Sequence, residues 1–63
     1  MINRAKFLVF KGNDNLWYWH LQANNNEIIA QSEGYESKQG ALKGIDAVRD
    51  ACQIAKVLIE IEE

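Results

Sequence analysis

The chain has 63 residues, of which 48% are hydrophobic and 25% charged, with seven basic and nine acidic side chains. This length makes one domain at most, and the composition is ordinary for a globular chain. The net charge of −2 gives no overall attraction to nucleic acid or to anionic membranes. A single cysteine and a single histidine exclude an intrachain disulfide and the common metal sites.

The sequence also bears on location and stability. No window approaches the eighteen apolar residues of a membrane helix, and no signal-peptide pattern opens the chain. We therefore expect a cytoplasmic protein with no membrane contact. No cofactor is expected either. Burial of apolar surface contributes on the order of 90 kcal/mol, and ordering the chain costs about 95 kcal/mol. Because these terms cancel, the chain is expected to need oligomerisation for stability.

Three short β-strands joined by tight turns are predicted in the first half of the chain. Residues 4–11, 16–22 and 27–32 are rich in β-forming side chains or alternate with a period of two. Residues 12–15 and 24–26 consist of Gly, Asn and Asp, which favour turns. This pattern predicts an antiparallel meander.

The aromatic side chains of residues 16–22 divide between the two faces of the predicted sheet. Trp17 and Trp19 share one face, and Tyr18 and His20 share the other, because side chains alternate along a strand. We expect the tryptophans to form the core beneath a helix. Tyr18 and His20 form a candidate aromatic surface on which nucleic-acid bases could stack. The acidic balance of the chain disfavours nucleic acid as a partner.

The hydrophobic period changes after residue 36, where a helix is predicted. Ser37 can cap the helix through its hydroxyl group. Gly40 and Gly44 each cost a helix about 1 kcal/mol relative to alanine, and we interpret them as sites of close packing on the sheet. One apolar stripe is defined by residues at helical spacing: Ala41, Leu42, Ile45, Val48, Ala51 and Cys52.

Residues 55–63 alternate again and predict a fourth strand, with Val57, Ile59 and Ile61 on one face. The element order is therefore β-β-β-α-β. The sequence predicts one α+β domain over residues 1–63, with one helix packed on an antiparallel sheet.

Several motifs follow one another in a fixed order: aromatics before Leu21, Ile28-Ile29-Ala30, Ser32-Glu33-Gly34-Tyr35, Ser37-Lys38, and Gly44-Ile45 with Val48. Together they resemble the YegP-like family of small bacterial proteins, a domain of unknown function. Family members often carry two tandem copies, and the fold looks like two β3-α-β motifs that share one sheet and exchange their C-terminal strands. For a single-copy chain the resemblance implies a homodimer, with Val57, Ile59 and Ile61 in the exchanged strand.

One turn departs from the family pattern. Relatives tend to place Asn-Gly between the second and third strands, whereas this chain has Asn26 at the glycine position. Asparagine can adopt the same left-handed conformation, so the hairpin is expected to form.

The charge at the two ends of the chain suggests a register for the exchanged strand. If the last strand lies beside a first strand, Arg4 and Lys6 can face Glu60 and Glu62. Each such pair stabilises by only a few tenths of a kcal/mol, so its main effect would be on register.

No catalytic residue and no metal site is predicted. Cys52 and His20 could pair as nucleophile and base, but they fall on different elements, and Cys52 is expected to be buried in the helix stripe. Glu33 and Glu36 could form an acid–base pair, although the dipole of a helix N-terminus also favours carboxylates there.

The turn before the helix is the candidate contact for a ligand or partner, through Ser32, Glu33, Tyr35 and Lys38, because polar loops often carry function. The alternative is a structural turn, anchored by Tyr35. The sequence thus predicts a non-enzymatic homodimeric module that binds an unidentified protein or small molecule or has a structural role. A nucleic-acid binder and a small hydrolase or isomerase with turn carboxylates are the alternatives.

Overall fold

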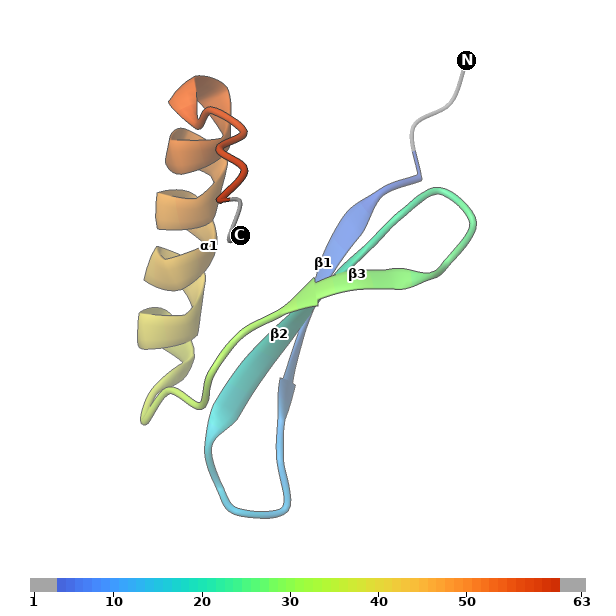
Figure 1. Cartoon of the computed structure of the whole chain (residues 1–63). Helices are drawn as coiled ribbons and strands as arrows, with labels where there is room; N and C mark the ends of the chain where they lie inside the picture. Colours follow the sequence, from blue (N-terminus) through green and yellow to red (C-terminus); the bar gives the residue numbers. More distant parts are fainter. Residues whose placement is uncertain (1–3, 61–63) are drawn as a thin grey trace.

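The computed structural model describes residues 4–60, which form a three-stranded antiparallel sheet and one helix (Figure 1). The strands are β1 (Lys6–Lys11), β2 (Trp17–Gln22) and β3 (Ile28–Gln31), and they lie in the order β1-β2-β3. The helix is α1 (Lys38–Ile54). The predicted α+β class, meander and helix are confirmed.

The two hairpins of the sheet have the same turn geometry. Asn15 and Asn26 have φ angles of 67° and 70°, the left-handed conformation. Their N–H groups donate to the carbonyls of Gly12 (3.0 Å) and Ala23 (2.9 Å), respectively. Asparagine adopts this conformation more readily than most residues, because its short polar side chain bonds locally. Asn26 therefore replaces glycine as predicted.

The core of the single chain is small and centres on β2. Trp19, Ala41 and Ile45 are its buried residues, with exposures of 5%, 0% and 8%. Phe7 on β1 meets the Trp19 ring edge-on, with 5.3 Å between ring centroids. Trp17 is half-buried against this cluster. The prediction that the two tryptophans build the core beneath the helix is confirmed.

The two glycines of the helix lie close to the side chains of Tyr35 and Trp19. The Tyr35 ring lies across the start of α1, so a Cβ at Gly44 would be 2.8 Å from Tyr35 Cζ and 3.3 Å from Trp19 Nε1. A Cβ at Gly40 would be 3.5 Å from Tyr35 Cδ1. The predicted packing role is thus confirmed, and it is strongest at Gly44.

Ser37 caps α1 as predicted, since its Oγ accepts a hydrogen bond from the N–H of Gly40 at 3.0 Å. The predicted apolar stripe, in contrast, is covered only near this end. Ala41 and Ile45 are buried and Val48 is half-buried, whereas Leu42, Ala51 and Cys52 are exposed. The expectation of a buried Cys52 is wrong for the single chain, because the sheet reaches only the first half of the helix face.

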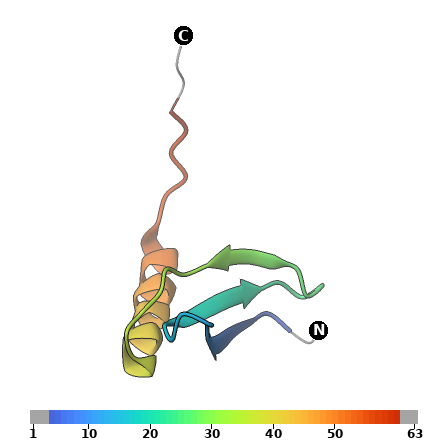
Figure 2. The ribbon, with the colours of Figure 1, turned by 90° about the horizontal axis from the view of Figure 1, so that it is seen from below.

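No fourth strand forms within residues 55–60, which corrects the predicted element order for the single chain. The helix ends at Ile54, and the chain then leaves in an extended conformation beyond the β3 side of the sheet (Figure 2). Val57 and Ile59 are 89% and 78% exposed. Ile61, the third residue predicted for this strand, lies outside the described residues.

We expect Gly44→Ala to lower the free energy of unfolding by about 1–3 kcal/mol. Alanine raises helix propensity by about 1 kcal/mol, but overpacking against Tyr35 and Trp19 outweighs that gain. Urea unfolding measures the difference. Gly40→Ala is the matched control, since its new methyl group has more space, and it should destabilise less than Gly44→Ala. Equal or higher stability of Gly44→Ala would contradict the packing argument.

Candidate binding surfaces

The loop between β3 and α1 contains the predicted contact residues, and two of them hold the loop in place. The Ser32 hydroxyl accepts a hydrogen bond from the N–H of Trp19 (2.9 Å) and donates one to the carbonyl of Glu33 (2.8 Å). The Ser32 N–H donates to the carbonyl of Trp19 at 3.0 Å. Ser32 therefore continues the pairing with β2 after the regular strand has ended.

Tyr35 closes the same loop onto β2. Its N–H donates to the carbonyl of Trp17 (2.8 Å), and its carbonyl accepts from the N–H of Trp17 (2.7 Å). Its ring lies over the glycines of α1. The backbone and the ring of Tyr35 thus both hold the loop against the rest of the fold. This agrees with the alternative of a structural turn that is anchored by Tyr35.

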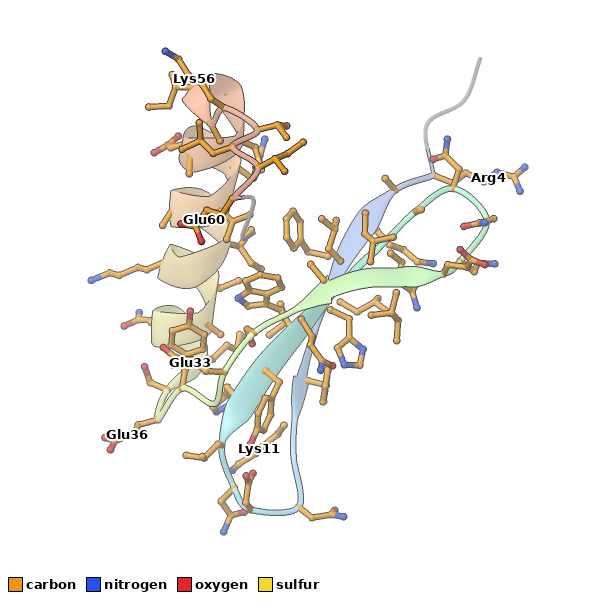
Figure 3. The ribbon with its side chains drawn as sticks, viewed as in Figure 1. Arg4, Lys11, Glu33, Glu36, Lys56 and Glu60 are labelled. Carbon is orange, nitrogen blue, oxygen red and sulfur yellow. The ribbon has the colours of Figure 1, made fainter. Side chains whose placement is uncertain are left out.

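The charged residues of the loop remain accessible. Glu33, Glu36 and Lys38 are all exposed, and the two carboxylates lie in the turn that precedes α1 (Figure 3). No cavity of ligand size is present in the described part of the chain. Glu33 and Lys38 are consequently the side chains of the predicted contact that a partner could reach directly.

The face of the sheet opposite the helix carries an ordered group of aromatic side chains. Phe10 on β1 pairs with Tyr18 on β2, and the rings stack at 5.8 Å with an interplanar angle of 20°. Phe10 also meets His20 edge-on at 4.7 Å. We call Phe10, Tyr18 and His20 the outer aromatic face. Phe10 was absent from the predicted surface, although its alternation with Phe7 and Val9 places it there.

Asp14 fixes the position of Tyr18 from the first hairpin. The Tyr18 hydroxyl donates to Asp14 Oδ2 at 2.5 Å, and the N–H of Leu16 donates to Asp14 Oδ1 at 3.0 Å. These bonds, that from Tyr18 foremost, lower the pKa of Asp14 below its ordinary 3.8. The same bond raises the pKa of Tyr18 above 10.0. The sequence feature that could have indicated this contact is an aspartate in a predicted turn, four residues before a tyrosine in the following strand.

The structure does not bring Cys52 and His20 together as a catalytic pair. His20 belongs to the outer aromatic face, whereas Cys52 lies on the helix that packs on the opposite face. Within residues 4–60 no group of His, Cys, Asp and Glu side chains could hold a metal ion. Over the same residues, the one helix is too short and too polar to cross a membrane.

The Asp14–Tyr18 hydrogen bond gives a pH prediction. Its stabilising contribution is present above pH 3.8 and is lost as the pH falls through the lowered pKa of Asp14. On the alkaline side it is present below pH 10.0 and is lost as the pH rises through the raised pKa of Tyr18.

Asp14→Asn should bring the pKa of Tyr18 back toward 10.0. Spectrophotometric titration of tyrosine measures this pKa, with Tyr18→Phe to identify the signal of Tyr35. An unchanged Tyr18 titration in Asp14→Asn would contradict the contact.

Comparison with known proteins identifies relatives of nearly the whole chain. Residues 13–58 match the family model described as "Domain of unknown function (DUF1508)". The chain is 43% identical over 54 residues to a UPF0339 protein of Treponema denticola, which covers 86% of this chain and 93% of that protein. It is 45% identical over 49 residues to a UPF0339 protein of Pseudomonas aeruginosa, covering 78% of this chain and 44% of that one.

The fold also has a solved counterpart. The NMR solution structure of a protein from Haloferax volcanii has a TM-score of 0.82 and 37% sequence identity, covering 94% of this chain and 100% of that chain. The chain is also 34% identical over 55 residues to a UPF0339 protein of the archaeon Methanosarcina acetivorans, so the family extends beyond the bacteria that the resemblance suggested. The predicted YegP-like resemblance is confirmed: the chain belongs to the DUF1508 family of UPF0339 proteins, small domains of unknown function.

Proposed function

We propose that the protein is a non-enzymatic, cytoplasmic homodimer that exchanges its C-terminal strands and serves as a binding or structural module. The observation that carries this proposal is the large solvent-exposed surface of the single chain. The chain exposes 5662 Å², whereas a folded monomer of this mass exposes about 4,100 Å². The excess of roughly 1,500 Å² exceeds the ~800 Å² that a partner buries in a standard interface.

The most exposed apolar side chains lie together at the C-terminal end of the chain. Ile54, Val57, Leu58 and Ile59 are 81%, 89%, 84% and 78% exposed, respectively. Contiguous apolar surface of this kind is rare on monomers and marks an interaction site. The radius of gyration of 14.0 Å is also large for 63 residues, since a compact domain of that length has about 10.6 Å. A second copy of the chain would supply an equal apolar segment, and we therefore propose it as the partner that covers this surface.

The Pseudomonas relative supports the same architecture. This chain corresponds to less than half of that protein, as expected if the relative carries two such units in one chain. A single-unit protein would then reach the equivalent arrangement by association. In the dimer, the loop with Glu33 and Lys38 would be presented twice, to an unidentified protein or small-molecule partner.

Sedimentation at micromolar concentration tests the proposal. We expect the wild type to sediment at twice the 7.2 kDa chain mass. Ile59→Asp should weaken the dimer at least 100-fold, because an unpaired carboxylate in the interface costs about 3 kcal/mol or more. Asn13→Asp, in an exposed turn, is the control and should remain dimeric. A folded wild-type species of 7.2 kDa would overturn the proposal.

A second candidate function, binding of single-stranded nucleic acid, is favoured by the outer aromatic face. Its rings are already ordered, and Lys6 on β1 lies on the same face by strand alternation. Lys11 contributes on the other face, where its Nζ lies 5.9 Å from the Trp17 ring centroid. Bases that stack on such aromatics contribute about 1–3 kcal/mol each. The net charge of −2 opposes this function, so any binding should be weak and confined to low salt.

Fluorescence anisotropy with a labelled single-stranded oligonucleotide decides this candidate. Binding at low salt that weakens at least five-fold in Tyr18→Ala would support it, since one stacking platform is removed. Asn13→Ala serves as the control, and circular dichroism verifies that both variants are folded. Absence of binding by the wild type at low salt would eliminate this function.

A further inference from the structure

The outer aromatic face belongs to a second apolar surface of the chain, separate from the C-terminal segment. Three large apolar side chains are exposed on it: Leu8 at 41%, Phe10 at 37% and Ile28 at 52%. Leu8 is paired with His20 across β1 and β2, and Ile28 with Gln22 across β2 and β3. Because directly paired residues point to the same face of a sheet, these side chains form one continuous surface.

The described elements outside the sheet do not cover this surface. The helix packs on the opposite face, where Ala41 and Ile45 surround Trp19. Residues 55–60 leave beyond the β3 side of the sheet (Figure 2). A strand added to a sheet edge hydrogen-bonds in the plane of the sheet, so the homodimer proposed above would extend this face without covering it. Contiguous exposed apolar surface marks an interaction site.

The two ends of the surface carry charges of opposite sign. Lys6 begins β1 and lies on this face by strand alternation. Asp14 lies at the other end, where its Oδ2 accepts the hydrogen bond of the Tyr18 hydroxyl. Lys11 belongs to the opposite face, with its Nζ 5.9 Å from the Trp17 ring centroid. The surface therefore has a basic end and an acidic end, with apolar and aromatic side chains between them.

We infer that the outer aromatic face packs on the same face of a second copy that is turned end for end, with Lys6 of each copy near Asp14 of the other. An apolar surface with opposite charges at its two ends is complementary to itself in this orientation, as a two-fold contact between identical surfaces requires. The orientation with both basic ends together would place like charges near each other and is disfavoured. The contact does not depend on the homodimer proposed above; where both form, they join four chains.

Single-stranded nucleic acid is the competing occupant of this surface, and the charges favour a second copy. The net charge of −2 opposes the approach of a polyanion. The Asp14 carboxylate also lies at the hydroxyl of Tyr18, the ring on which a base would stack, and it would repel the phosphates of that strand. A second copy instead brings Lys6 to the Asp14 carboxylate.

The size of the surface sets the strength expected of the contact. With strands of six, six and four residues, about 3.3 Å per residue and about 4.8 Å between strands give a flat area of roughly 250 Å². This is well below the ~800 Å² that each partner buries in a standard interface. We therefore expect the contact to form at much higher protein concentration than the homodimer.

Sedimentation of the full chain from micromolar to millimolar concentration tests the contact. The mass of the wild type should double over this range, from two to four chain masses where the homodimer forms. Leu8→Glu should abolish the doubling and leave the mass at low concentration unchanged. Gln39→Glu, which adds the same charge at an exposed site on the helix, is the control and should behave as the wild type. Circular dichroism verifies that both variants are folded.

The outcomes separate this inference from the homodimer. Ile59→Asp, which weakens the homodimer, should still double its mass, from one to two chain masses. A wild type whose mass stays at one or two chain masses up to millimolar concentration would overturn the inference. Doubling that persists in Leu8→Glu as in Gln39→Glu would do the same. Doubling that is abolished by an oligonucleotide bound through Tyr18 would support the shared surface, whereas such binding without any doubling would assign the surface to nucleic acid.

A double-mutant cycle tests the end-for-end orientation. Lys6→Glu should raise the dissociation constant of the contact about five-fold, because two symmetric charge pairs become repulsive. In an Asp14→Asn background the same change should have a much smaller effect, since the opposing carboxylate is gone. Lys43→Glu, an exposed charge reversal on the helix, is the control. An equal effect of Lys6→Glu in both backgrounds, or an equal effect of Lys43→Glu, would overturn this orientation.

Discussion

The contact of Trp19 with the helix holds the single chain together. Trp19 lies at the centre of β2, and Ala41 and Ile45 are the other buried residues around it. Gly44 permits this approach, because a Cβ there would collide with the Tyr35 ring and lie 3.3 Å from Trp19 Nε1. Among residues 4–60 the indole Nε1 is buried and has no hydrogen-bond partner, which adds a cost that the surrounding apolar contacts have to exceed. The described part of the single chain is therefore built around one well-packed point, with little core elsewhere.

Local features of this fold could be predicted from the sequence because their causes are local. The hairpins follow from Asn15 and Asn26, the helix start from Ser37, and the core face of β2 from the alternation of Trp17 and Trp19. The prediction of a buried Cys52 is wrong for a geometric reason. Periodicity identifies the apolar side of a helix but not how much of it is covered. The 17 residues of α1 span about 26 Å, and the crossing sheet meets only the first half.

The candidate contact loop shows a different limit of sequence reasoning. The sequence predicts that Ser32 and Tyr35 contact a ligand or partner. In the structure, Ser32 is hydrogen-bonded to the backbone of Trp19 and Tyr35 to that of Trp17, on a strand more than ten residues away. No local pattern separates a polar side chain that satisfies the backbone from one that is accessible. Glu33 and Lys38 have no such role in the described contacts and remain exposed. The fourth strand could not be placed within one chain for a related reason: in the proposed dimer, its pairing edge belongs to another molecule.

The exposed C-terminal segment also bears on the tendency of the chain to aggregate. Val57, Leu58 and Ile59 form a short apolar run of high β-propensity, bounded by Lys56 and Glu60. In an amyloid-like stack of identical segments, each Lys56 would lie over another Lys56 and each Glu60 over another Glu60. Charged residues in these flanking positions act as gatekeepers against aggregation. The two charges that bound the segment thus oppose uncontrolled self-stacking during synthesis and folding.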